Sequence, residues 1–202
     1  MRALDVVAAE GLPAVRVITP CRHQDTRGFL SEVWREDALT EAGIDVRFVQ
    51  ENHAASRKTG TIRGLHFQIG TAAQAKLVRC PRGSIFDVAV DIRHGSPTFG
   101  RHTGIVLSAK NWKQLYVPEG FAHGYCTLEP DTEVVYKVTA YYDPASERGL
   151  AWDDPDIGIA WPVSPEQAVL TERDRAFPRL AELHDFFRRR PCWPPTRAPT
   201  RR

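Results

Sequence analysis

Short hydrophobic runs, separated by turn-forming residues, dominate the chain from about residue 14 to residue 140. Runs of this length and spacing predict the strands of a β-sandwich or a β-barrel. The expected strands cover residues 14–18, 29–34, 46–50, 61–68, 76–80, 84–92, 104–107, 114–117 and 133–140. Glycine and proline gather between them, for example in Pro81-Arg82-Gly83 and Pro118-Glu119-Gly120, where turns are expected. The pattern therefore predicts an all-β fold.

Two short helices are expected in addition, at residues 36–42 and 178–188. In the second, Leu180, Leu183 and Phe187 recur at helical spacing, so this apolar stripe should pack against the β-sheets. A chain of this length is sufficient for one domain with a sizeable core. We therefore expect a single domain over residues 1–187.

Alternation along a strand assigns side chains to faces. In residues 133–142, Tyr136 and Tyr142 fall on the same face. In residues 61–68, strict alternation places Arg63 and His66 on opposite faces, unless Gly64 marks a β-bulge or the strand begins there. The pattern leaves both arrangements open.

The segment Arg63-Gly64-Leu65-His66-Phe67-Gln68 is followed, ten residues after the histidine, by Lys76. An imidazole and an ammonium on neighbouring strands are the groups needed to remove a proton beside a ketone and to stabilise the enolate. Taken alone, His66 is equally consistent with a hydrogen-bonded core histidine, and Lys76 with a solvated edge charge. Lys76 opens an otherwise apolar run, however, where a buried ammonium is costly unless it is paired or used.

Other polar residues in the expected strands allow alternatives. His53, His66 and His123 could ligate a metal ion, but the chain has no His-x-His pair and no clustered glutamate to complete the site, which favours no metal. His123 is equally consistent with a hydrogen-bonding wall residue. Asp87 and Asp91 share one face of an apolar run, and indicate either a half-exposed strand or a carboxylate that orients an imidazole or binds sugar hydroxyls.

Several function classes lack their sequence signatures. No Gly-x-Gly-x-x-Gly follows an expected strand, and neither a P-loop nor a Gly-x-Ser-x-Gly elbow occurs. Four cysteines lie far apart without a Cys-x-x-Cys pair, which is typical of reduced thiols rather than of a disulfide or zinc framework. These observations favour a redox-neutral reaction without a nucleotide cofactor.

The net charge of +2 conceals an uneven distribution. Residues 188–202 carry six arginines and no acid, and subtracting this +6 leaves −4 on the remaining 187 residues. Four prolines accompany the arginines, so we expect a disordered tail and no nucleic-acid binding. No apolar run approaches the about 20 residues needed to span a bilayer, and Asp5 and Glu10 interrupt the N-terminal apolar stretch. We therefore expect a cytoplasmic protein without a membrane partner.

A series of specific motifs occurs in order along residues 12–185. They are Asp25-Thr26-Arg27-Gly28-Phe29, Phe48-Val49-Gln50-Glu51-Asn52-His53, Arg63-Gly64-Leu65-His66-Phe67-Gln68, Gln74-Ala75-Lys76-Leu77-Val78-Arg79-Cys80, Phe86-Asp87-Val88-Ala89-Val90-Asp91-Ile92-Arg93, Ser96-Pro97-Thr98-Phe99-Gly100, Pro118-Glu119-Gly120-Phe121-Ala122-His123-Gly124, Tyr136-Lys137 and Asp154-Pro155-Asp156-Ile157-Gly158-Ile159-Ala160-Trp161-Pro162. In these motifs the chain resembles the dTDP-4-dehydrorhamnose 3,5-epimerases, cofactor-free sugar-nucleotide epimerases of the cupin superfamily.

The resemblance implies a double-stranded β-helix (jelly roll, cupin-like) with a helical C-terminal segment. It also implies a homodimer formed through the sheets, with an edge strand of the N-terminal segment exchanged between protomers. The implied substrate is dTDP-4-dehydro-6-deoxy-D-glucose, inverted at C3 and C5 to dTDP-4-dehydro-L-rhamnose on the way to L-rhamnose. No cofactor is implied, because the C4 ketone already acidifies both neighbouring carbons.

The resemblance further assigns catalytic roles. His66 is the base and Asp174 the carboxylate that orients it, as in a triad. Lys76 faces the C4 oxygen and stabilises the enolate. Tyr136 returns a proton from the opposite face of the sugar, and a nearby ammonium is expected to lower the pKa of this phenol.

The remaining substrate-binding positions also follow from the resemblance. Tyr142 matches a position that stacks on thymine, and Lys76 contacts the sugar. The other matching positions are Arg27, Glu32, Gln50, Asn52, Arg63, His123, Glu147 and Arg173. Arginines suit the diphosphate through bidentate contacts, although Arg173 stands where the family often has lysine. A single-centre epimerase, a metal-dependent cupin and a non-catalytic sugar-nucleotide-binding module remain as alternatives.

Overall fold

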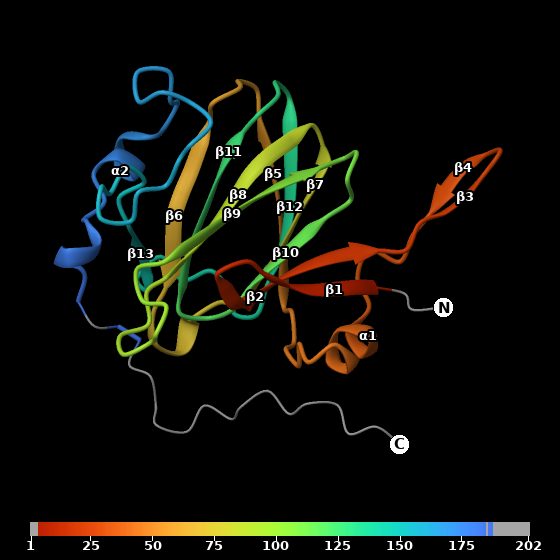
Figure 1. Ribbon diagram of the computed structural model, residues 1–202, viewed down its shortest axis with the longest axis horizontal. Helices are drawn as coiled ribbons and strands as arrows, with labels where there is room; N and C mark the ends of the chain where they lie inside the picture. Colours follow the sequence, from red (N-terminus) through yellow and green to blue (C-terminus); the bar gives the residue numbers. More distant parts are fainter. Residues whose placement is uncertain (1–3, 185, 188–202) are drawn as a thin grey trace.

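The fold is built from two antiparallel β-sheets that face each other (Figure 1). The computed structural model describes residues 4–184, 186 and 187. The six-stranded sheet has the order β1 (Leu4–Ala9), β2 (Leu12–Pro20), β10 (Gln114–Val117), β7 (Lys76–Arg82), β12 (Thr132–Val138) and β5 (Gln50–Ser56). The five-stranded sheet has the order β13 (Glu147–Gly149), β6 (Ile62–Gln68), β11 (Phe121–Thr127), β8 (Ser84–Asp91) and β9 (His102–Ser108). The expected all-β fold is confirmed.

The remaining elements are short. The strands β3 (His23–Asp25) and β4 (Gly28–Leu30) form a hairpin that projects away from the two sheets (Figure 1). The α-helices are α1 (Glu36–Glu41) and α2 (Glu172–Arg175), and single 3-10 turns occur at Gly70–Ala72 and Leu180–Glu182. None of the described helices is long and apolar enough to cross a membrane.

Side chains on the inner faces of both sheets fill the space between them. This inner core includes Val15, Val78 and Leu115 from one sheet and Ile85, Leu107 and Phe121 from the other. Alternation places Leu77 on the outer face of the six-stranded sheet, where it packs with Leu39 of α1. Lys76 lies on the same face of β7 as Val78 and therefore points inward between the sheets.

A second apolar layer covers the outer face of the five-stranded sheet. Leu65, Phe67, Val88 and Val90 of that face are buried under the segment that follows β13. This C-terminal segment runs beside β6 (Figure 1). It thereby brings residues 171–177 next to the strand that carries His66.

The expected helix at residues 178–188 is wrong for the residues that the structure describes. Only Leu180–Glu182 form a 3-10 turn, because neighbouring groups take the backbone hydrogen bonds that a helix would need. The amide of Leu180 donates to Asp154 Oδ2 at 2.7 Å, and the carbonyl of Pro178 accepts from the amide of Ala151 at 2.8 Å. The expected packing is nevertheless confirmed, since Leu180, Leu183 and Phe187 lie against the outer face of the five-stranded sheet.

Two of the expected strands are placed incorrectly. Residues 46–49 are not a strand, and β5 begins only at Gln50; Val46 and Phe48 alternate because they pack beside α1. The strand expected at residues 29–34 ends at Leu30. The strands β1, β3, β11 and β13 are additional. Of these, β11 is buried along its whole length, so it lacks the alternation that reveals a half-buried strand. The tail at residues 188–202 lies outside the described residues, so its expected disorder stays a prediction.

Candidate active site

A cavity of about 610 Å³ lies between the sheets, and polar side chains from both of them line it. Of the residues singled out in the sequence, it is lined by Arg63, His66, Lys76, His123, Tyr136, Tyr142, Glu147, Arg173 and Asp174. Gln50 and Asn52 line an adjoining cavity of about 200 Å³, which shares His66, Lys76 and Tyr136 with the first. The structure therefore brings most of the expected site residues together from segments distant in the sequence.

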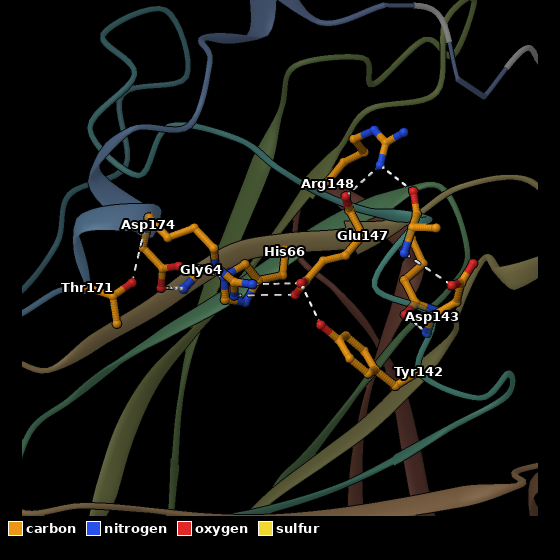
Figure 2. A network of polar contacts seen from close by, with 11 residues as sticks. Gly64, His66, Tyr142, Asp143, Glu147, Arg148, Thr171 and Asp174 are labelled. Carbon is orange, nitrogen blue, oxygen red and sulfur yellow. Dashed lines mark hydrogen bonds and ion pairs between the residues drawn. The ribbon is translucent and has the colours of Figure 1, made fainter.

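His66 and Asp174 form the best-defined contact of the site. His66 Nε2 lies 3.0 Å from Asp174 Oδ1, and the other carboxylate oxygen accepts from the amide of Gly64 at 3.3 Å. Thr171 caps α2 by accepting from the amide of Asp174 at 3.1 Å, which fixes this carboxylate at the helix start. Figure 2 shows Asp174, Gly64 and Thr171 gathered beside His66. Contact at Nε2 leaves Nδ1 as the ring nitrogen able to accept a proton.

The ionisation of Asp174 follows from these contacts. Burial alone raises the pKa of this carboxyl, but the hydrogen bond and charge of His66 and the bond from the Gly64 amide outweigh it. The net effect lowers the pKa of Asp174 below its usual value. Asp174 is therefore ionised at neutral pH and can support an imidazolium at His66.

A β-bulge brings Arg63 to the same cavity as His66. His66 lies opposite His123 in the pairing of β6 with β11, whereas Arg63 lies opposite Tyr125, which is a shift of register between the two positions. Gly64, with a φ of +132°, stands at this shift, and a Cβ there would lie 2.6 Å from Cα of Gly124. Only glycine suits that conformation and that close approach. The alternative in which Gly64 marks a bulge is confirmed.

Lys76 is the first residue of β7, and its side chain is buried. Its side chain donates from Nζ to the carbonyl oxygen of His66 at 3.4 Å, and the residue is only 8% exposed. Burial lowers the pKa of Lys76 to about 8, although the charges of Asp87 and Glu147 oppose this effect. At neutral pH most of the molecules therefore carry a charged ammonium inside the cavity.

Tyr136 faces the same cavity from β12 of the other sheet. The expectation that a neighbouring cation lowers its pKa is wrong as a net effect. Burial raises the pKa of Tyr136, and the charge of Arg63 offsets only part of the increase. The phenol is therefore protonated at neutral pH, which is the state that a proton donor needs.

Glu147 organises the outer part of the site. It accepts from Tyr142 Oη at 2.9 Å and from Arg173 at 2.7 Å, as Figure 2 shows for Tyr142. The amide of Tyr142 donates to Gln50 Oε1 at 3.0 Å, and Gln50 in turn donates to Asn52 at 2.9 Å. These bonds hold the half-exposed Tyr142 ring at the rim of the cavity.

His123 is held by a second carboxylate. Its Nε2 lies 2.8 Å from Asp87 Oδ1, and both side chains are buried. The interpretation in which a carboxylate of this strand orients an imidazole is therefore confirmed for Asp87. Asp91 instead accepts hydrogen bonds from Arg93, Ser96 and Thr98 in the turn that follows β8.

Three of the sequence candidates lie elsewhere. Arg27 pairs with Asp25 on the projecting hairpin, and Glu32 pairs with Arg35; neither lines the two cavities around His66. His53 is exposed beside Glu133, away from His66 and His123. Among the residues that the structure describes, no group of three His, Cys, Asp or Glu side chains is placed to hold a metal ion.

Phe177 and Tyr125 are site residues that the sequence did not reveal. The ring of Phe177 lies edge-on to His66, with 5.5 Å between the centroids, and fits over Gly149, where a Cβ would lie 2.3 Å from the ring. Tyr125 lines the cavity from β11. Recognising β11 as a strand would have placed Tyr125 on the face of His123, but no pattern around Phe177 indicates its contact.

The sequence matches a family model and a curated relative along most of its length. The family model described as dTDP-4-dehydrorhamnose 3,5-epimerase matches residues 10–182. The dTDP-4-dehydrorhamnose 3,5-epimerase of Sinorhizobium fredii is 52% identical over 173 residues, which are 86% of this chain and 88% of the relative.

Two crystal structures are similar in fold. One is a dTDP-6-deoxy-D-glucose-3,5-epimerase from Legionella pneumophila in complex with dTDP-4-keto-L-rhamnose, with a TM-score of 0.87 and 38% identity over 93% of this chain and 99% of that chain. The other is a dTDP-4-dehydrorhamnose 3,5-epimerase from Bacillus anthracis with TDP and PPi bound, with a TM-score of 0.84 and 42% identity over 88% of this chain and 99% of that chain. The expected cupin-like β-sandwich is confirmed, and this chain belongs to the dTDP-4-dehydrorhamnose 3,5-epimerase family.

Proposed function

We propose that this protein inverts dTDP-4-dehydro-6-deoxy-D-glucose at C3 and C5, giving dTDP-4-dehydro-L-rhamnose for dTDP-L-rhamnose synthesis. The observation that carries the proposal is the gathering of a carboxylate-backed imidazole, a buried ammonium and a phenol in one cavity. These groups are sufficient for proton transfer beside a ketone, since the carbonyl itself makes the neighbouring C–H bonds acidic.

His66 begins the reaction as the base. It takes a proton from the carbon beside the C4 ketone, and the electron pair of that C–H bond moves to form the enolate. Asp174, 3.0 Å from the ring, stabilises the imidazolium that results. The low pKa of Asp174 supports this role because the carboxylate keeps its charge while the ring gains one.

Lys76 stabilises the enolate. Its ammonium can donate to the C4 oxygen as negative charge develops there, inside a site where burial strengthens the attraction. With a pKa of about 8, it is charged at neutral pH. A fixed cation at this oxygen serves both carbons, since C3 and C5 flank the same carbonyl.

Tyr136 completes the inversion by protonating the carbanion from the face opposite His66. Its raised pKa supports the role of an acid that holds its proton until the enolate forms. The phenolate then regains a proton and the imidazolium releases one, so each cycle restores both groups. The same cycle at the second carbon completes the double epimerisation.

The outer residues of the site suit the nucleotide. Arg63 and Arg173 offer forked donors for the diphosphate. Tyr142, held by Glu147 and Gln50 at the rim, offers an aromatic face for thymine. The remaining polar positions Asn52 and His123 complete the expected contacts to the substrate.

We further propose a homodimer in which the β3–β4 hairpin reaches the cavity of the partner subunit. Arg27 and Glu32 match substrate-binding positions of the family, yet within their own chain they lie outside the cavity. The hairpin projects from the sheets (Figure 1) and exposes 56% of Phe29 and 74% of Leu30. Light scattering at micromolar concentration is expected to give the mass of a dimer, and a monomer would contradict this arrangement. A cytoplasmic location also stays a proposal.

The function is tested by incubation with dTDP-4-dehydro-6-deoxyglucose in D₂O, with proton NMR of C3 and C5. The expected result is exchange and inversion at both carbons. His66→Ala is expected to lower the rate by about 10²–10⁴-fold, the range for one general base. Exchange at one carbon alone would instead identify a single-centre epimerase, and tight binding without exchange a sugar-nucleotide-binding module.

A further inference from the structure

Two buried aspartates on strand β8 have very different surroundings. Asp91 accepts from Arg93, Ser96 and Thr98 at 2.6–2.7 Å, so its carboxylate is fully engaged. Asp87 is 0% exposed, and its Oδ1 meets His123 at 2.8 Å. Its Oδ2 has no hydrogen-bond partner among the described residues. A buried carboxylate with one direct partner costs stability, so folding gives no reason for a charged residue at position 87.

The position of His123 gives such a reason. His123 lies directly opposite His66 in the pairing of β11 with β6, and both residues line the cavity. Each imidazole meets a carboxylate through Nε2, His66 at Asp174 and His123 at Asp87. The two rings are thus fixed side by side, with Nδ1 left as the nitrogen available to a ligand.

Asp87 also acts on Lys76, whose Nζ donates to the carbonyl of His66. The negative charges that raise the pKa of Lys76 against its burial are those of Asp87 and Glu147. Other titratable groups around the same cavity are Arg63, His66, His123, Tyr125, Tyr136, Tyr142, Arg173 and Asp174.

We propose that Asp87 is a positioning residue for the epimerisation, which fixes His123 beside His66 and whose negative charge favours the charged form of nearby Lys76. The inference rests on the proposed function and deepens it. Asp87 does not line the cavity and therefore does not touch the substrate. It acts through the two residues that do: His123, whose ring it orients, and Lys76, whose charge it maintains for the enolate.

Removal of the Asp87 charge should change the pH dependence of the activity in a defined direction. Without it, burial of Lys76 is less opposed, and its pKa falls below the present value of about 8. Since the reaction needs the charged ammonium, the decline of activity at alkaline pH moves to lower pH. A carboxylate with a purely structural role would not shift this decline.

The test compares Asp87→Asn with Asp91→Asn, a matched control on the same strand and also buried. Turnover of dTDP-4-dehydro-6-deoxyglucose is measured against pH, and stability by denaturant unfolding. For Asp87→Asn we expect kcat to fall at least about tenfold with KM changed less than about threefold. The alkaline decline should move to lower pH, and the loss of stability should be smaller than in Asp91→Asn, because Asp87 Oδ2 has no partner to lose. Asp91→Asn is expected to lose stability and to keep the wild-type pH profile.

A second comparison tests the route through His123. In a His123→Gln background the oriented ring is absent, so Asp87→Asn should lower kcat by a smaller factor than in the wild type while still shifting the alkaline decline. An unchanged kcat and pH profile in Asp87→Asn would overturn the inference, as would a loss of stability as large as that of Asp91→Asn. Wild-type protein without turnover would contradict the proposed function instead, which separates the two failures.

Discussion

The space between the two sheets has an apolar end and a polar end, and the same strands supply both. On β7, Val78 belongs to the inner core whereas Lys76 points into the cavity. On β11, Phe121 is in the core and His123, two residues later, is at the cavity. Every second residue of these strands therefore points inward at both ends. Where these residues are apolar they form the core, and where they are polar they line the cavity proposed for proton transfer.

The two ends contribute to folding stability with opposite signs. Apolar residues at the filled end stabilise the fold by burial. At the other end, burial lowers the pKa of Lys76 to about 8 and raises that of Tyr136, so the polar groups there are held under conditions that cost stability. Substitutions at the two ends should therefore affect activity and stability in opposite ways.

Lys76→Met, at the polar end, is expected to have the largest effect. It replaces a buried ammonium by an apolar chain of similar length, so kcat is expected to fall by about 10²–10³-fold, as for loss of an oxyanion donor. The free energy of unfolding is expected to rise, because a pKa lowered from 10.5 to about 8 means that the folded chain holds the charged ammonium at a cost. Steady-state turnover and urea unfolding check both effects, and a less stable variant would contradict the account.

Leu115→Ala tests the apolar end. Leu115 is 0% exposed in the inner core, so truncation should lower the free energy of unfolding by about 2–5 kcal/mol. The kcat of the folded fraction should stay within about threefold of the wild type. The control is Val106→Ala on the 45% exposed Val106, expected to cost less than about 0.5 kcal/mol. A large loss of kcat in folded Leu115→Ala would show that the ends are not separable.

The pH dependence of stability and of turnover tests the same comparison, with a smaller expected effect than the two substitutions. Because Lys76 has a folded pKa of about 8 against an ordinary value of 10.5, the unfolded chain binds more protons between these values. The contribution of Lys76 to the free energy of unfolding therefore increases as pH rises from about 8 to 10.5. Over the same window kcat/KM declines, since the ammonium loses its charge. Unfolding and turnover measured against pH should show opposite slopes, and Lys76→Met should remove this part of the stability slope.

The local sequence pattern was sufficient to predict some of the site residues. Lys76 and His66 were predicted because each lies in a strand whose alternation is visible in the sequence. Asp174, the partner of His66, was not visible in this way, since it lies 108 residues from His66 in the chain and reaches it through the packing of α2 on β6. It came from the family resemblance alone.

Other errors share a cause, which is that tertiary contacts override local pattern. The apolar spacing of Leu180, Leu183 and Phe187 predicted a helix, but hydrogen bonds to Asp154 and Ala151 hold the backbone in another conformation. The direction of the Tyr136 pKa was also wrong, because the degree of burial is a property of the folded chain.

Tyr136→Phe, followed by NMR in D₂O, tests the central claim most directly, because it separates proton removal from proton return. If His66 removes the proton and Tyr136 delivers one to the opposite face, this variant should still exchange hydrogen for deuterium at the substrate carbons. Inversion should fall at least about 100-fold, since only return to the original face remains. Loss of exchange together with inversion, as expected for His66→Ala, would contradict the division of roles between the two sheets.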